Sequence, residues 1–201
     1  EEVVIPEAEK ISTVYRKVPD EGTDPQSIRG FLDVDVAPMP IFGKGFKAHV
    51  TSSCHDEVGK RNLIDIPALD KFIRNLSNKI LKHKKEIILV ERDHEGAEVV
   101  LVSYGAVSRA AAMAASLARD KGFPVGTFRL ITAWPFPEEE VEAMAKTAKH
   151  VMVLENNLGQ MYPYIKAAAA CHARVSLIPP QWVGEIQDPE YILNRIQEVL
   201  R

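Results

Sequence analysis

The sequence predicts an α/β fold: a three-layer, mainly parallel sheet over residues 86–201, preceded by an irregular Pro/Gly-rich connector and a basic amphipathic helix. Short, continuously apolar runs alternate with longer helical stretches from residue 97 to residue 161, and such runs are typical of strands that helices cover on both faces. Strands separated by helices of this length indicate right-handed crossovers and hence a parallel sheet. Each predicted strand ends in a small or polar turn. In a parallel sheet such turns gather along one edge, where α/β domains place ligands and partners.

The first 64 residues differ from the rest because proline and glycine recur through them while apolar residues come in short bursts. This composition favours turns and extended chain over long helices. An irregular segment of this length is expected to wrap over a neighbouring domain or subunit, because long loops are uncommon unless they pack on something.

A helix is predicted next, beginning near Pro67, since proline suits a first helical turn. Leu69, Ile73, Leu76 and Ile80 follow at the spacing of one helical face. Lysine and arginine occupy much of the remainder. These basic residues form either a solvated face or a docking surface for an acidic partner.

The elements of the predicted sheet domain follow in alternating order. Apolar runs predict strands at residues 87–90 (an edge strand), 99–102, 125–131, 151–154 and 175–178. Helices are predicted at residues 106–121, from Pro137 onward, at 161–171 and at 189–200. Gly122 lies where a helix end favours a positive φ angle. Pro137 and the three glutamates after it suit a helix start, because proline fits the first turn and carboxylates complement the positive end of the helix dipole.

Composition argues against several classes of function. The net charge of −3 is too small to favour nucleic-acid binding. No run of about 18 apolar residues occurs, so no membrane span is predicted. The chain begins Glu1-Glu2, with neither an initiator methionine nor the basic start of a signal peptide. We therefore expect its start to be a cut, a processing site or an engineered boundary, so that part of the parent protein is absent.

The two cysteines lie far apart in the sequence. Cys171 follows an alanine run near a predicted helix end and is expected to be a buried, small apolar residue. Cys54 precedes His55, Asp56 and Glu57, where a polar turn is favoured over a reactive thiol or a metal site, since adjacent side chains seldom converge on one ion. Two cysteines cannot hold an iron–sulfur cluster, which takes four thiolates or two thiolates with two histidines. Their scarcity favours a reducing, cytoplasmic setting.

The first strand-to-helix turn contains Ser103, Gly105 and Ser108. A dinucleotide-binding fingerprint needs three glycines, so that the chain can turn tightly and approach the pyrophosphate. This turn has one glycine, so NAD or FAD binding is not predicted. The helix-start amides leave two interpretations: a simple tight turn, or an anion site for a carboxylate or phosphate with both serines as donors.

A second turn carries Trp134 in a rigid, aromatic and proline-rich loop. This loop packs either on its own domain or against another domain or subunit, since exposed aromatic side chains are favoured interface anchors.

A third turn contains Glu155, Asn156, Asn157 and Gln160, directly after a predicted buried strand. Glu155 is expected to accept hydrogen bonds from helix-start amides or from a facing chain. A general-base role is the alternative, but no His or Lys lies nearby in the sequence to act with it. No catalytic residue and no metal site are predicted for this chain.

Three blocks of the sequence resemble the alpha subunit of 2-oxoacid:ferredoxin oxidoreductases, especially the 2-oxoglutarate or branched-chain type: SYGAVSRAA, GFPVGTFRLITAWPFP and VMVLENNLGQM. The resemblance covers residues 86–201, and SCHDEVG at residues 53–59 is similar to the connector of those subunits. It implies that residues 86–201 form a transketolase C-terminal-like domain. Residues 1–85 would then hold the tail of a preceding domain, the connector and a linker helix. Most of the thiamine-pyrophosphate pyrimidine-binding domain that opens such subunits is expected to be absent.

The resemblance implies an enzyme that oxidatively decarboxylates a 2-oxoacid, with 2-oxoglutarate favoured, reduces ferredoxin and forms an acyl-CoA. Thiamine pyrophosphate, magnesium, iron–sulfur clusters and CoA are expected in the whole complex. None is expected on this chain alone, which would be inactive by itself. The expected partners are the beta subunit, a second alpha subunit, and ferredoxin through the complex. The strand-end turns would then serve as contact surface in a structural and assembly part of the enzyme.

Two alternatives remain. A standalone anion- or CoA-binding α/β module would use the helix starts after Gly105 and Asn157. The C-terminal part of a transketolase or of an E1 beta-like subunit would share the same outline.

Overall fold

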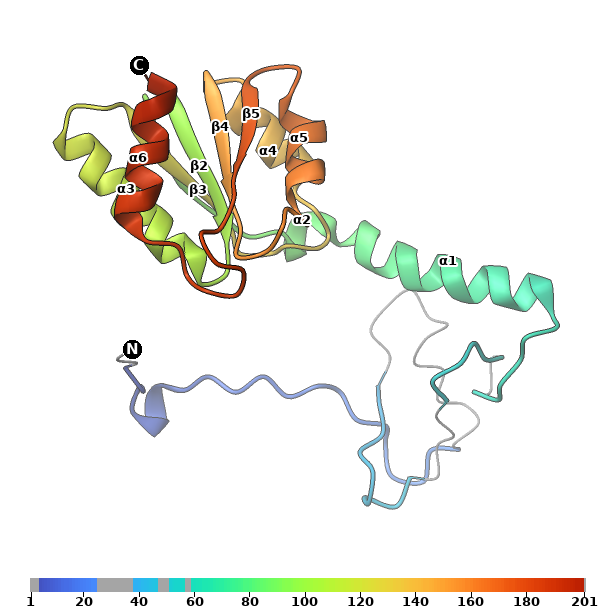
Figure 1. Ribbon diagram of the computed structural model, residues 1–201. Helices are drawn as coiled ribbons and strands as arrows, with labels where there is room; N and C mark the ends of the chain where they lie inside the picture. The colour runs from blue at the N-terminus through green and yellow to red at the C-terminus, as the bar shows by residue number, and fades with distance from the viewer. Residues whose placement is uncertain (1–3, 25–37, 47–50, 57–58, 201) are drawn as a thin grey trace. The chain divides into compact units, whose positions relative to one another are not determined.

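The computed structural model describes residues 4–24, 38–46, 51–56 and 59–200 (Figure 1). The chain divides into two compact units, Glu1–His83 and Lys84–Arg201. No helix within the described ranges is both long enough and apolar enough to cross a bilayer.

The first unit is largely irregular over its described residues, apart from a short 3-10 turn, η1 (Ala8–Lys10), and a long helix, α1 (Ile66–Lys82). The helix begins where the Asp65 side chain accepts a hydrogen bond of 3.1 Å from the Ala68 amide, and Pro67 occupies its first turn. This is the predicted amphipathic helix. None of its residues is buried.

The second unit is a three-layer α/β domain, as predicted (Figure 1). Its sheet contains β1 (Val90–Asp93), β2 (Val99–Tyr104), β3 (Val125–Leu130), β4 (His150–Leu154) and β5 (Arg174–Ile178). Its helices are α2 (Lys84–Ile87), α3 (Val107–Asp120), α4 (Glu138–Ala145), α5 (Tyr162–Ala169) and α6 (Pro189–Leu200). The spatial order of the strands is β1-β3-β2-β4-β5. Strands β2 to β5 are parallel, and β1 pairs antiparallel with β3.

The edge strand begins later than predicted. Residues 84–87 form helix α2, and β1 starts at Val90 and continues through three charged residues. These charges suit an edge position, and Glu91 forms an ion pair of 3.0 Å with Arg129 on β3. The short turn after β1 has no crossover helix, so the chain reverses its direction into β2. Because β3 is parallel to β2, β1 pairs with β3 in the antiparallel sense.

The core consists of two layers, one on each face of the sheet. Helices α3 and α6 cover one face, and α4 and α5 cover the other (Figure 1). Helix α3 places five alanines against the sheet, and all of them are buried. Every residue of β2 up to Ser103 is buried as well, which explains its continuously apolar sequence.

Cys171 is exposed, so the prediction that it is buried is wrong. Helix α5 ends at Ala169, two residues earlier than predicted. The core positions at this end of the domain are taken by Ala169 and Ala173. The alanine run therefore faces the core only in part, and the thiol lies in the turn that leaves the helix.

Gly126 on β3 faces the backbone of the turn that follows β1. A Cβ atom added there would lie 2.6 Å from the carbonyl oxygen of Asp93 and closer still to the Cα atom of His94. Both are backbone atoms and cannot rotate away. We predict that Gly126→Ala lowers the free energy of unfolding by about 2–3 kcal/mol, the cost of overpacking.

Urea unfolding of the full chain, followed by circular dichroism, measures this change. Gly122→Asn is a matched control, because Gly122 has φ +82° with open space around it and asparagine tolerates this backbone conformation. Equal stability of the Gly126→Ala and wild-type chains would contradict the steric argument.

Candidate functional site

The candidate site lies at the carboxyl ends of the parallel strands, in the turns that follow β2, β3, β4 and β5. The structure places there all the residues that the sequence singled out: Ser103, Gly105, Ser108, Trp134, Glu155, Asn156, Asn157 and Gln160. Side-chain hydrogen bonds join the turns after β2, β4 and β5, whereas the bond between Ser103 and Ser108 stays within one turn.

Glu155 links the end of β4 to the start of α5. It is fully buried, and its carboxylate accepts hydrogen bonds from the Met161 amide at 3.0 Å and the Tyr162 amide at 2.8 Å. The prediction that Glu155 accepts bonds from helix-start amides is confirmed. A third bond, of 3.1 Å, comes from the Tyr104 hydroxyl at the end of β2.

Asn157 extends this network in two directions. Its Oδ1 atom accepts bonds of 2.9 Å from the amides of Gly159 and Gln160, which shapes the turn. Its Nδ2 group donates to the Tyr104 hydroxyl at 2.8 Å. Burial raises the pKa of Tyr104, while the hydrogen bond from Asn157 opposes that change.

Tyr104 was not identified as a site residue from the sequence. The sequence did contain a signal for it: Tyr104 follows one predicted strand and Glu155 follows another. Because parallel strands finish at the same edge, a hydroxyl and a carboxylate in those positions can meet.

Ser103 and Ser108 lie at the turn between β2 and α3. Both are buried, and the Ser103 hydroxyl donates to the Ser108 hydroxyl at 3.1 Å. Gly105 between them has φ +63°, a conformation that glycine adopts without strain. The two hydroxyls thus hydrogen-bond each other across the turn.

The loop after β3 divides into an inward and an outward part. Thr132 ties it down, since its hydroxyl donates to the Ile87 carbonyl at 2.8 Å and accepts from the Leu89 amide at 3.1 Å. The Phe136 ring lies 5.8 Å from the ring of Tyr164 on α5. Trp134 instead remains 67% exposed. Part of the loop therefore packs on its own domain, and contact of Trp134 with another domain or subunit stays a prediction.

The loop between β5 and α6, residues 179–188, was missed entirely by the sequence analysis. The Gln187 amide nitrogen donates to the Glu155 carbonyl at 2.9 Å, and the Gly184 amide donates to the Asn156 carbonyl at 3.2 Å. Figure 1 shows this loop crossing the end of the sheet before α6 begins. The available signal was a second tryptophan, Trp182, in a proline-flanked segment after a strand.

These loops expose large apolar side chains at the edge of the sheet, and we call these residues the carboxyl-edge surface. Its members and their exposed fractions are Trp134 (67%), Leu158 (80%), Trp182 (72%), Val183 (64%) and Ile186 (60%). Exposed large apolar residues that gather at one end of a domain are typical of contact surfaces.

The segment around Cys54 forms the predicted polar turn in its described part. The Lys60 amide donates to the Asp56 carboxylate at 2.9 Å, and a ring nitrogen of His55 lies 2.8 Å from the Asp56 carbonyl. Glu57 lies outside the described residues. Within the described ranges, no three His, Cys, Asp or Glu side chains gather closely enough to hold a metal ion.

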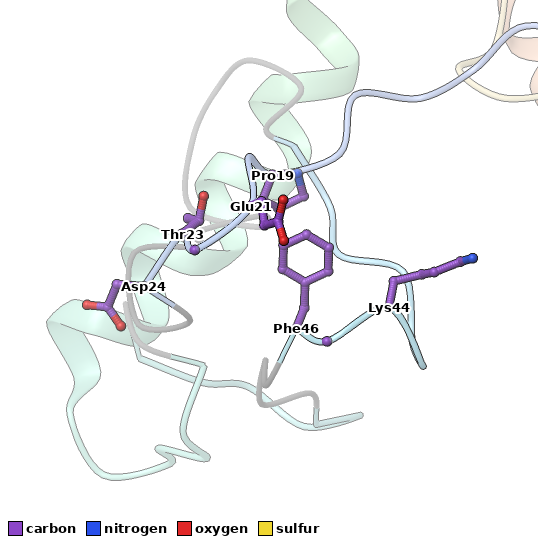
Figure 2. A pocket seen from close by; sticks show the side chains of 8 residues that line it. Pro19, Glu21, Thr23, Asp24, Lys44 and Phe46 are labelled. Atoms are coloured by element: carbon purple, nitrogen blue, oxygen red, sulfur yellow. The ribbon is translucent and has the colours of Figure 1, made fainter.

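A separate pocket of about 560 Å³ lies in the first unit. Its lining comes from Pro19, residues 21–24 and residues 44–46. Figure 2 shows the Phe46 ring beside Glu21, with the Lys44 side chain directed away from both. The pocket therefore does not bring its charged groups together, and the carboxyl edge of the sheet is the stronger candidate site.

The buried Glu155 carboxylate supports a first prediction for this site. Glu155→Gln replaces one acceptor oxygen by an amide group, which would face backbone N–H donors. We expect the free energy of unfolding to fall by about 1–3 kcal/mol, the cost of unpaired buried donors. Urea unfolding measures the change. Glu139→Gln, an exposed carboxylate in the first turn of α4, is the matched control, and equal effects of the two substitutions would contradict this role.

The Tyr104 phenol supports a second prediction. Because its folded-state pKa is raised by burial, it contributes stability that is fully present below the unfolded pKa of about 10. That contribution is lost as the pH rises through the folded-state pKa. Phenolate absorbance during alkaline titration measures this, with Tyr104→Phe identifying the step. A step that coincides with the same step in urea-unfolded protein would contradict the prediction.

Comparison with known proteins places this fold in a family. Residues 97–188 match the family model of the pyruvate:ferredoxin oxidoreductase core domain II. The 2-oxoglutarate synthase subunit KorA of Methanothermobacter thermautotrophicus is 37% identical over 204 residues, which cover 100% of this chain and 53% of that protein. The KorA subunit of Methanothermobacter marburgensis is 38% identical over 159 residues, 79% of this chain and 42% of that protein. The chain thus spans about half the length of the curated relatives it matches.

A solved structure supports the same fold. The 2-oxoglutarate:ferredoxin oxidoreductase from Magnetococcus marinus aligns with a TM-score of 0.73 and 24% identity over 98% of this chain and 34% of that chain. At this identity the likeness concerns the fold alone. The family resemblance of the three sequence blocks is confirmed by the family model and the relatives together. The chain belongs to the family of KorA-type 2-oxoacid:ferredoxin oxidoreductase subunits.

Proposed function

We propose that this chain is the C-terminal structural and assembly part of the alpha subunit of a 2-oxoacid:ferredoxin oxidoreductase. The observation that carries the proposal is the 37–38% identity with subunits named 2-oxoglutarate synthase KorA. Residues 86–201 correspond to a transketolase C-terminal-like domain. Residues 1–85 correspond to the tail of a preceding domain, the connector and a linker helix.

The whole enzyme, in this proposal, takes a 2-oxoacid, with 2-oxoglutarate favoured, together with CoA and oxidised ferredoxin. It releases carbon dioxide and forms an acyl-CoA and reduced ferredoxin. The two electrons lost by the 2-oxoacid as its carbon–carbon bond breaks pass to ferredoxin. This complex would work in the cytoplasm and contain a beta subunit and a second alpha subunit.

The cofactors belong, in our proposal, to other parts of the complex. Two cysteines are fewer than the thiolates of an iron–sulfur cluster. The hydroxyls of Ser103 and Ser108 hydrogen-bond each other, and the Glu155 carboxylate is occupied by helix-start amides. These internal hydrogen bonds support the proposal that thiamine pyrophosphate and magnesium are held by other parts of the complex.

The carboxyl-edge surface is the part of this chain that, in our proposal, contacts the beta subunit. Hydrogen bonds within the domain hold the Tyr104 hydroxyl and the Gln187 amide nitrogen at this edge, and the five large apolar side chains of the surface remain exposed. Burying such side chains against another protein is favourable by about 25 cal/mol per Å² of apolar area. Tryptophan is enriched among the residues that dominate interface energies, which makes Trp134 and Trp182 the expected anchors.

Co-expression tests the assignment. The chain is produced with the beta subunit and the remaining alpha-subunit domain from the same source, and complex formation is measured by co-purification and by titration. Trp134→Ser is expected to weaken association by about tenfold or more, the effect of losing one interface anchor. Met113→Ser is the matched control, because Met113 is 54% exposed on α3, away from this edge.

Activity provides the complementary measurement. The purified chain is expected to show no oxidation of 2-oxoglutarate, and the reconstituted complex is expected to reduce ferredoxin with it. A chain that never associates with these partners, or that turns over alone, would overturn the proposal. Calorimetry with CoA distinguishes this proposal from a standalone anion- or CoA-binding module. Heat of CoA binding by the isolated chain would favour the module.

A further inference from the structure

We propose that Gln187 is a positioning residue, which clamps the 179–188 loop to the ends of β4 and β5 and thereby presents Trp182 to a neighbouring subunit. The clamp itself is a property of this chain. Its role in presenting Trp182 rests on the proposed function of the carboxyl-edge surface.

The Gln187 side chain is buried and lies between the ends of two strands. It is 2% exposed although it lies in a loop. Its amide nitrogen donates to the Glu155 carbonyl at 2.9 Å and approaches the Ile178 carbonyl at 3.4 Å. Leu154 and Ile178 are register partners on β4 and β5. One amide group thus bridges the ends of two neighbouring strands, where the ladder of backbone hydrogen bonds has finished.

Two other hydrogen bonds hold the same loop. The Tyr191 hydroxyl on α6 donates to the Pro179 carbonyl at 3.1 Å, which holds the beginning of the loop. The Gly184 amide donates to the Asn156 carbonyl at 3.2 Å, which holds its middle. Gly184 has φ +93°, a conformation that side chains rarely adopt. The loop is therefore attached at its beginning, middle and end.

The side chains between these attachments explain why the clamp is needed. Trp182, Val183 and Ile186 all remain exposed. A free loop with this composition would turn its apolar side chains toward the core, because water disfavours apolar surface. The attachments are polar and use backbone atoms, so they fix the path of the loop and leave the apolar side chains outside. This arrangement lowers the entropy lost on binding a partner, since the loop is already ordered.

The partner is another polypeptide with a mainly apolar acceptor surface. Glu185 is the charged residue between the attachments at Gly184 and Gln187, and it is exposed. The contact is thus dominated by an indole and two aliphatic side chains. We propose that this polypeptide is the beta subunit. Trp134 lies on the same edge of the domain, and the proposed function already places it in contact with the beta subunit.

Hydrogen–deuterium exchange on the full chain tests the clamp without any partner. In Gln187→Leu the volume is kept and the donor is lost, so the Gly184 amide should exchange about tenfold faster or more, through local opening of the loop. Amides of β2 and β4 should keep their protection. Gln181→Leu is the matched control, since Gln181 is an exposed glutamine in the same loop.

A second variant provides a test by rescue. In Gln187→Glu an ionised carboxylate would face two carbonyl oxygens, and the loop should open. Protonation at low pH restores one O–H donor, so Gly184 protection should return relative to wild type measured at the same pH. Fluorescence anisotropy of Trp182, in a Trp134→Phe background, should follow the same pattern.

The outcomes separate the clamp from the proposed interface. Unchanged Gly184 exchange in Gln187→Leu, or equal acceleration in β4, would overturn the clamp. A loosened loop with unchanged affinity for the beta subunit would overturn the presentation of Trp182. Failure of the wild-type chain to bind the beta subunit would instead count against the proposed function, and the exchange result would stand.

Discussion

The hydrogen-bonded burial of Glu155 is the interaction on which the carboxyl edge of this domain depends. An ionised carboxylate is costly to remove from water unless its oxygens receive hydrogen bonds. Here the amides of Met161 and Tyr162 and the hydroxyl of Tyr104 supply them. These bonds tie the start of α5 to the end of β4, and they add a side-chain link to the end of β2, which already pairs with β4 in the sheet. The residue therefore organises the edge, and its acidity plays no part in our account of function.

The backbone of Glu155 extends this role to the last loop of the domain. Its carbonyl accepts from Gln187, and the next carbonyl, of Asn156, accepts from Gly184. Hydrogen bonds within the domain thus join the ends of β2, β4 and β5. Outside these bonds, the large apolar side chains of the carboxyl-edge surface remain exposed. A structural requirement of the fold produces a surface suited to protein contact.

Much of the fold could be predicted because it depends on periodicity. Buried parallel strands read as apolar runs, and the helices between them read as amphipathic or alanine-rich stretches, so β2 to β5 and α3 to α6 were expected within a few residues. The exceptions have local causes. The strand β1 carries charges because it is an edge strand, and Cys171 follows a helix that ends early. Neither property leaves a periodic signal in the sequence.

The sequence by itself determined the fold class, the family and the positions of the turns at one edge of the sheet. The role of Glu155 as an acceptor also followed from its place between a strand and a helix start. Only the tertiary structure decided which turns meet. Tyr104 and Asn157 are 53 residues apart, and Gln187 reaches Glu155 across 32 residues. Such contacts depend on the order of strands in the sheet, which brings distant segments together and has no counterpart in local sequence patterns.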